Sequence, residues 1–160
     1  GRIVNTASPS GIYGNIGQSN YGAAKAGIAA FTIITAMELT KYGVTVNCLA
    51  PGAYTRMTKD LPGFAGMDEE TQEKMGPRWI AVTTAWLCSD AAQNVTGRIF
   101  DIVGQRVGIA EQWKLGPTAM QTDDPADMTD VIAGLMAEAV LNSDMGGHPT
   151  EGPGRPGKTI

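Results

Sequence analysis

Histidine and cysteine are scarce in this sequence of 160 residues: His148 is the single histidine, and Cys48 and Cys88 are the two cysteines. A protein metal site needs several such ligands, or carboxylates, close together, so we predict no metal site. His148 falls in a stretch rich in glycine and proline, where we expect it on the surface. Both cysteines have apolar neighbours, so we expect them to behave as small hydrophobic residues in a reducing compartment.

Positive charge is also in short supply. Lysine and arginine total 12 against 16 acidic residues, which gives a net charge of -4. No basic stripe is present to neutralise phosphates, so we expect no nucleic-acid partner. The best apolar run is interrupted by Lys25 and threonines before it reaches the roughly 18–20 residues that span a bilayer, so we expect no membrane association. The last residues are not a Ser-Lys-Leu type signal, so we expect the cytoplasm rather than the peroxisome.

What the sequence does contain is an alternation of apolar strands and helices. Strand-like runs occupy 2–7, 44–49 and 98–103, and helix-like runs lie between them at 20–42 and 77–89. Ser19 or Asn20 is a good helix N-cap, and Gly43 suits the position after a helix end. Because both connections are long enough for a helix, the strands should be parallel. The pattern predicts an α/β fold: the C-terminal half of a Rossmann-type, doubly wound parallel sheet, βαβαβ.

The remaining segments are less regular. Residues 57–76 form a loop with a short acidic helix and are the best candidate for a mobile lid. Residues 105–122 are irregular with some strand character, 126–142 read as an amphipathic helix, and a Gly- and Pro-rich tail follows. We predict two parts: a catalytic half-domain over 1–110, and a C-terminal extension with one helix and the tail over 111–160.

The helix at 20–42 is unusual because it is apolar on all sides. Between Tyr21 and Glu38 its one ionic residue is Lys25. A helix of this kind must be covered on more than one side. We expect one side to pack on the sheet and the other on a partner subunit, in a homodimer or homotetramer.

Three residues form a candidate catalytic group: Ser8, Tyr21 and Lys25. Tyr21 and Lys25 are four apart, so a helix places them on one face, one turn apart. An ammonium group nearby favours the phenolate form of a tyrosine, which is a base. Ser8 follows the first strand, at the edge of a parallel sheet where such folds bind ligands. Taken singly, Lys25 is equally well a surface lysine and Ser8 a turn residue; the apolar surroundings of Lys25 favour a functional role.

These motifs resemble those of the short-chain dehydrogenase/reductase family. The resemblance covers residues 1 to about 110 and lies in YGAAK (21–25), Ser8 thirteen residues before Tyr21, and VNCLAPG (46–52). GIYGNIGQSNYGAAK (11–25) and PGAYTRMT (51–58) are most similar to the branch with the (3R)-hydroxyacyl-CoA dehydrogenase unit of peroxisomal multifunctional enzymes, the 17β-hydroxysteroid dehydrogenases and their bacterial relatives.

The resemblance implies a role for each matching residue. Ser8 would hydrogen-bond the substrate oxygen, and Tyr21 would be the general acid/base on it. Lys25 would bind the nicotinamide ribose and, with Tyr21, border the cofactor. Further cofactor contacts would come from Pro51, Gly52, Ala53 and Thr55, the last with the carboxamide or the phosphates. The reaction would be hydride transfer between NAD, or NADP, and a secondary alcohol or ketone, with a small 3-hydroxyacyl-CoA or hydroxysteroid-type substrate.

Other motifs of the family are not in this sequence. They are its glycine-rich turn, its NAD/NADP selector and its Asn-Asn-Ala-Gly stretch, which belong in a preceding segment. We therefore expect the chain to need a missing N-terminal half for activity. Two alternatives stay open: a non-catalytic fragment whose apolar helix serves association, and one component of a split dehydrogenase whose glycine-rich half is a separate chain.

Overall fold

The computed structural model describes residues 1–111, 113, 115–140, 143 and 146. The chain divides into two compact units, residues 1–111 and 112–160, and each is described here by itself. His148 and most of the predicted tail lie outside the described residues.

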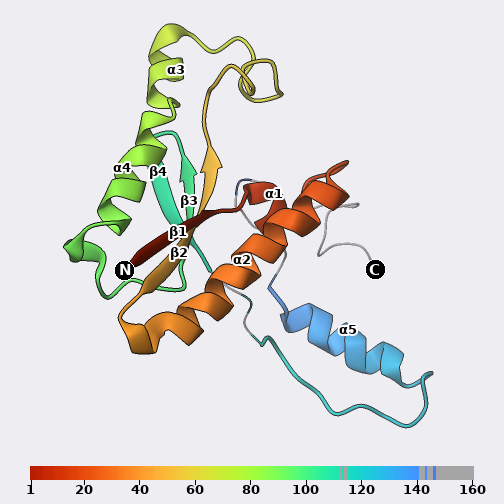
Figure 1. The fold of residues 1–160 in the computed structure, drawn as a ribbon. Coiled ribbons are helices and arrows are strands. Elements are labelled where there is room, and N and C mark those ends of the chain that lie inside the picture. The colour runs from red at the N-terminus through yellow and green to blue at the C-terminus, as the bar shows by residue number, and fades with distance from the viewer. Residues whose placement is uncertain (112, 114, 141–142, 144–145, 147–160) are drawn as a thin grey trace. The chain divides into compact units, whose positions relative to one another are not determined.

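The first unit is built on a four-stranded sheet in the order β1-β2-β3-β4 (Figure 1). Strands β1, β2 and β3 are parallel, which confirms the predicted α/β fold class. Strand β4 pairs antiparallel with β3, through a turn in which Gly104 has a φ of +52°, so the strand character expected within 105–122 lies at its start. The strand bounds are Arg2–Thr6 for β1, Thr45–Gly52 for β2, Ile99–Val103 for β3 and Arg106–Ala110 for β4.

Helices cover both faces of this sheet. One face carries α2, packed over the small buried side chains Ala7, Cys48 and Ala50. The other carries α4, which buries Leu87 against Leu49. The helix bounds are Pro9–Ile12 for α1, Ser19–Leu39 for α2, Glu69–Lys74 for α3 and Arg78–Leu87 for α4; two 3-10 turns, η1 over Thr40–Tyr42 and η2 over Asp90–Ala92, complete the unit.

The long helix α2 begins at Ser19, and no side-chain hydrogen bond caps its N-terminus. Its N-cap is Gln18, not the expected Ser19 or Asn20, while Gly43 ends η1 in the left-handed conformation as expected. Ser19–Tyr42 is long and apolar enough to cross a membrane by length and composition alone, contrary to our count of its apolar run, but core helices pass the same test. Here α2 buries one side against β1 and β2.

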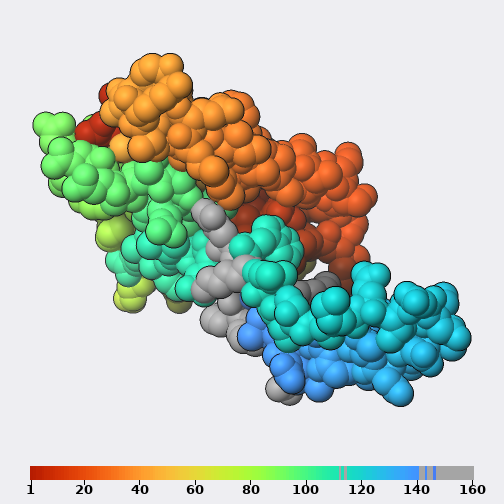
Figure 2. Space-filling model, turned by 90° about the horizontal axis from the view of Figure 1, so that it is seen from below, coloured from red at the N-terminus to blue at the C-terminus, as the bar shows by residue number. Residues whose placement is uncertain are grey.

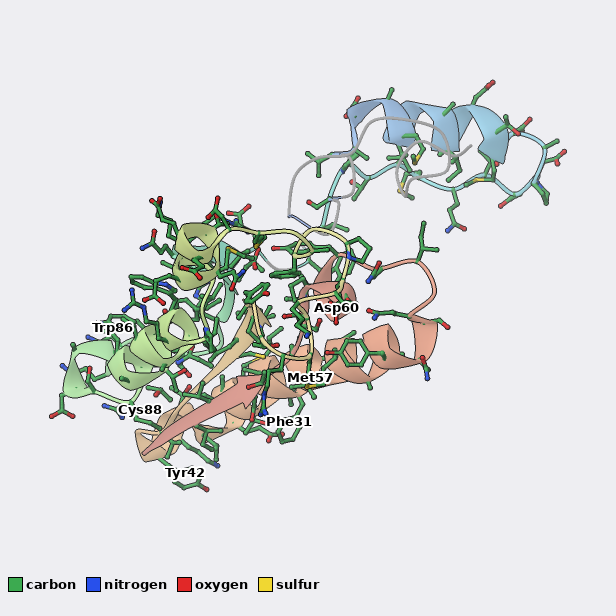
Figure 3. The ribbon with its side chains drawn as sticks, turned by 90° about the horizontal axis from the view of Figure 1, so that it is seen from above. Phe31, Tyr42, Met57, Asp60, Trp86 and Cys88 are labelled. Carbon is green, nitrogen blue, oxygen red and sulfur yellow. The ribbon has the colours of Figure 1, made fainter. Side chains whose placement is uncertain are left out.

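One expectation about the cysteine side chains is wrong. Cys48 is buried, and burial raises the pKa of its thiol, but Cys88 is exposed at the end of α4 (Figure 3). Trp86, on the same helix, is 44% exposed. The sequence shows that α4 is apolar but not which of its sides the sheet covers.

Among its described residues, the second unit has one helix, α5, over Met128–Glu138. It is shorter than the predicted 126–142 because Ala139 has extended backbone angles. None of the residues of α5 is buried: Met128, Val131 and Leu135 are half-buried and the others are exposed.

Helices α1 and α2 meet at a contact that leaves no room for a side chain. A Cβ atom at Gly11 would lie 2.6 Å from the Ala26 nitrogen and 2.7 Å from the Lys25 carbonyl carbon. At Gly22, it would lie 3.1 Å from the Ser10 oxygen. The glycines therefore fix how closely the segment after β1 approaches α2.

We predict that Gly11→Ala lowers the free energy of unfolding by about 1–3 kcal/mol, because the new methyl group meets backbone atoms that cannot rotate away. Gly27→Ala is the matched control, since nothing lies within 4 Å of its added Cβ atom. Gly27 lies inside α2, so alanine should instead stabilise the protein by up to about 1 kcal/mol. Urea unfolding of both variants measures the difference, and equal effects would contradict the close contact.

A buried carboxylate ties the loop after α1 to the sheet. Asp101, in β3, is 3% exposed. Its Oδ2 lies 3.3 Å from an Arg106 nitrogen and accepts a hydrogen bond of 3.5 Å from the Tyr13 hydroxyl. Burial raises the pKa of Tyr13 above its ordinary value of 10.0, and the Asp101 charge raises it further. Tyr13 therefore stays protonated at neutral pH and keeps donating.

We predict that Tyr13→Phe costs about 1 kcal/mol of unfolding free energy at pH 7, because Asp101 loses a donor in a buried position. Since the pKa is raised by folding, this stabilisation is fully present below the ordinary pKa and is lost as pH rises through the folded value. Tyr42→Phe, at an exposed position, is the control and should change little. Urea unfolding at pH 7 and pH 10.5 measures the loss of unfolding free energy and its pH dependence. Equal losses in Tyr13→Phe and Tyr42→Phe would refute a stabilising hydrogen bond from Tyr13 to Asp101.

Candidate active site

The parallel strands bring their carboxyl ends to one edge of the sheet. Ser8 stands two residues beyond β1, and the pairing of that segment continues through a 2.7 Å hydrogen bond from the Ala7 nitrogen to the Leu49 oxygen. Ala53 follows β2 directly, and Val103 ends β3. The predicted site residues after β1 and after β2 therefore share this edge, where open α/β folds bind ligands.

Ser8 is buried and is the N-cap of α1. Its Oγ accepts a hydrogen bond of 3.2 Å from the Ser10 nitrogen. A hydroxyl that accepts in this way still has its own proton to donate. The short helix α1, where the sequence predicted only a turn, thus orients Ser8 as a donor.

Tyr21 and Lys25 lie in the first two turns of α2. The Lys25 ammonium lies 5.7 Å from the centroid of the Tyr21 ring and donates a hydrogen bond of 3.1 Å to the Thr6 oxygen. Thr6 is the last residue of β1, two before Ser8. The ammonium therefore stands between the tyrosine ring and the strand end that carries the serine. Tyr21 is 43% exposed, so its ring is open to a ligand.

The end of β2 is more regular than expected. Pro51 and Gly52 lie beyond the predicted run 44–49, but they continue the strand and pair with Ile102 and Val103. A Cβ atom at Gly52 would lie 3.3 Å from a methyl group of Val103. A larger residue would crowd the strand beside the candidate site.

After β2, two threonine hydroxyls organise the loop. Thr55 Oγ1 lies 3.0 Å from Thr58 Oγ1 and accepts from the Met57 nitrogen at 3.2 Å. Thr58 Oγ1 accepts from the Thr55 nitrogen at 2.8 Å and donates to the Ala53 oxygen at 2.6 Å. Thr55 was a predicted site residue and Thr58 was not; the T-x-x-T spacing that gives this reciprocal capping was the available signal.

The predicted lid, residues 57–76, begins three residues after Tyr54 and includes α3. The Tyr54 nitrogen donates to the Met75 oxygen at 2.8 Å, so the chain just before the segment meets its end. Between them, short turns carry the exposed residues Met57 and Asp60 (Figure 3). Its function as a lid stays a prediction.

These residues fit the nicotinamide half of a dinucleotide. The Lys25 ammonium has three N–H groups and uses one on Thr6, which leaves two donors for ribose hydroxyls. Ser8 offers a donor for a substrate oxygen, and Tyr21 an exposed hydroxyl. Within the described residues, no group of three or more His, Cys, Asp or Glu is placed to hold a metal ion.

Comparison with known proteins finds relatives that are named reductases and dehydrogenases. A family model described as enoyl-(acyl carrier protein) reductase matches residues 1–104. Hydroxyacyl-CoA dehydrogenase ChsB1 of Mycobacterium tuberculosis is 39% identical over 130 residues, which are 81% of this chain and 39% of that protein. A 3-oxoacyl-(acyl-carrier-protein) reductase of Synechocystis is 43% identical over 110 residues, 67% of this chain and 44% of that protein.

A solved structure agrees. A short chain dehydrogenase from Mycobacterium avium has a TM-score of 0.76 and 37% identity, and the match covers 90% of this chain and 46% of that one. The chain thus spans less than half the length of these relatives. Sequence motifs, sheet topology and relatives lead to one conclusion: this chain belongs to the short-chain dehydrogenase/reductase family.

Proposed function

We propose that this chain supplies the catalytic half of an oxidoreductase that moves hydride between a nicotinamide cofactor and a secondary alcohol or ketone. The observation that carries the proposal is the Lys25 hydrogen bond to Thr6, which ties the first turns of α2 to the end of β1, two residues before Ser8. The family membership supports the same activity.

In this proposal each residue has one task. Ser8 donates a hydrogen bond to the substrate oxygen. Tyr21 takes the hydroxyl proton during oxidation and returns it during reduction. Lys25, whose ammonium lies 5.7 Å from the centroid of the Tyr21 ring, binds ribose hydroxyls. When bound, the nicotinamide accepts or supplies the hydride.

The cofactor contacts follow from the strand end. Pro51, Gly52 and Ala53 would border the nicotinamide with backbone atoms, and Thr55 would contact it with its hydroxyl. We propose NAD as the cofactor, on the similarity to the hydroxyacyl-CoA dehydrogenase branch. NADP is the alternative, and comparing the two as cofactors for one preparation decides between them.

The substrate class is inferred from the relatives. One is named a hydroxyacyl-CoA dehydrogenase and another a 3-oxoacyl-(acyl-carrier-protein) reductase. These names describe an acyl group that carries a hydroxyl and one that carries a 3-oxo group. We therefore propose a 3-hydroxyacyl or 3-oxoacyl thioester as substrate, ahead of a hydroxysteroid. We also propose a cytoplasmic location.

Two macromolecular partners are part of the proposal. The first is an N-terminal half that supplies the adenosine part of the cofactor site. The second is another copy of the chain, bound through α2, which lies on the outside of the first unit (Figure 2). On α2, Phe31, Ile34 and Met37 are 60%, 54% and 75% exposed. Large apolar side chains exposed together often mark an interface.

We predict that Tyr21→Phe lowers turnover at least about 100-fold, because the general acid/base is lost. The measurement joins this chain to the residues that precede the matched segment in the Mycobacterium tuberculosis relative and follows reduced cofactor with a 3-hydroxyacyl-CoA. Tyr42→Phe is the control and should keep full turnover. A Tyr21→Phe variant that retains most of the turnover would rule out the assigned role.

For the association, we predict that Ile34→Glu shifts the joined protein toward monomers, since a charge would be buried at the interface. Val82→Glu, at a position of α4 that is 61% exposed, shows whether any added charge has this effect, because α4 packs on the other face of the sheet. Sedimentation velocity measures the oligomeric state. Unchanged oligomers in Ile34→Glu would contradict assembly through this face.

A further inference from the structure

Thr58 stands at the centre of the hydrogen bonds after β2. Its Oγ1 lies 2.6 Å from the Ala53 oxygen, 2.8 Å from the Thr55 nitrogen and 3.0 Å from Thr55 Oγ1. The residue is half-buried, and no part of the proposed chemistry uses it.

The single proton of the Thr58 hydroxyl can be assigned from its partners. The Ala53 oxygen is a carbonyl and only accepts, while the Thr55 nitrogen only donates. A second carbonyl acceptor, the Thr55 oxygen, lies 3.5 Å away, so the Thr58 proton goes to the Ala53 oxygen at 2.6 Å. Toward Thr55 Oγ1, Thr58 has only a lone pair to offer.

This assignment fixes the direction of the Thr55 hydroxyl in turn. Its proton goes to Thr58, and its oxygen accepts from the Met57 nitrogen at 3.2 Å. One lone pair remains. Thr55 can then accept a hydrogen bond from a ligand but has no proton to give one.

We propose that Thr58 is a positioning residue that holds the Thr55 hydroxyl as an obligate hydrogen-bond acceptor. The inference rests on the proposed function, and it decides between the two contacts left open for Thr55. A phosphate oxygen only accepts, so it does not fit this hydroxyl. The N–H of the nicotinamide carboxamide does fit.

A purely structural role for Thr58 makes a different prediction. Thr58 and Thr55 also cap the turn that follows, and loss of that cap alone would weaken every ligand equally. Control of hydrogen-bond direction instead changes the ratio of the dissociation constants of two ligands that differ in one group.

The test uses the chain of 160 residues and two mononucleotides. Nicotinamide mononucleotide carries the carboxamide, with N–H donors, and nicotinic acid mononucleotide carries a carboxylate that only accepts. NMR titration gives both dissociation constants for the original chain, Thr58→Ser and Thr58→Val. The charge difference between the nucleotides is the same in every variant, so it cancels when the ratios are compared.

We expect Thr58→Ser to keep the original preference for the amide. In Thr58→Val the Thr55 proton is released and can bind the carboxylate, so the preference should fall about tenfold, the equivalent of one hydrogen bond. An unchanged ratio in Thr58→Val would overturn the proposal. If that variant does not fold, Thr55→Val serves instead: a preference that survives removal of the acceptor would overturn it equally.

A direct measurement separates this inference from the proposed function. NMR of the hydroxyl protons in the unliganded chain should place the Thr58 proton toward Ala53; finding it toward Thr55 would refute the inference. Failure of nicotinamide mononucleotide to bind the original chain would instead count against the proposed cofactor site, while the proton position would still decide the role of Thr58.

Discussion

The hydrogen bond from the Lys25 ammonium to the Thr6 carbonyl connects helix α2 to the end of strand β1. Lys25 is the one ionic residue between Tyr21 and Glu38, and a second polar contact joins α2 to β1: the Asn5 side-chain amide donates to Thr32 Oγ1 at 2.9 Å. Apolar packing has little directionality, so it does not by itself fix how α2 is rotated or shifted over the sheet. Hydrogen bonds are directional, and the Lys25 and Asn5 bonds both join α2 to β1; the Lys25 bond lies one turn from Tyr21, at the end of the strand that leads to Ser8.

The rest of the site depends on the close approach of helix α1 to helix α2. Gly11 and Gly22 let α1 lie against α2 with backbone in contact, and Ser8 is the N-cap of α1. Three parallel strands bring Ser8 and Ala53 to one edge. The Asp101 carboxylate, buried in β3, holds the next part of the chain through Tyr13. Charged and polar contacts therefore set the positions, and the apolar layers supply the stability.

Much of this arrangement was predictable from the sequence. The periodicity of the apolar residues identified three strands and two long helices, and the spacing of Tyr21 and Lys25 required them to share a helix face. The segment that forms β4 showed only some strand character in the sequence, because Gly108 interrupts its alternation. Thr58 was missed because capping is normally recognised by Glu or Gln at that position. The outward positions of Cys88 and Trp86 depend on packing that no local pattern encodes.

Direct observation of hydride transfer tests the central claim most sharply. The chain, joined to an N-terminal half, would be given NAD and a 3-hydroxyacyl-CoA that carries deuterium on the hydroxyl-bearing carbon, and the recovered cofactor would be analysed by mass spectrometry. The account predicts deuterium on the nicotinamide ring of the reduced cofactor. Cofactor and substrate that both bind without any transfer of deuterium would contradict it.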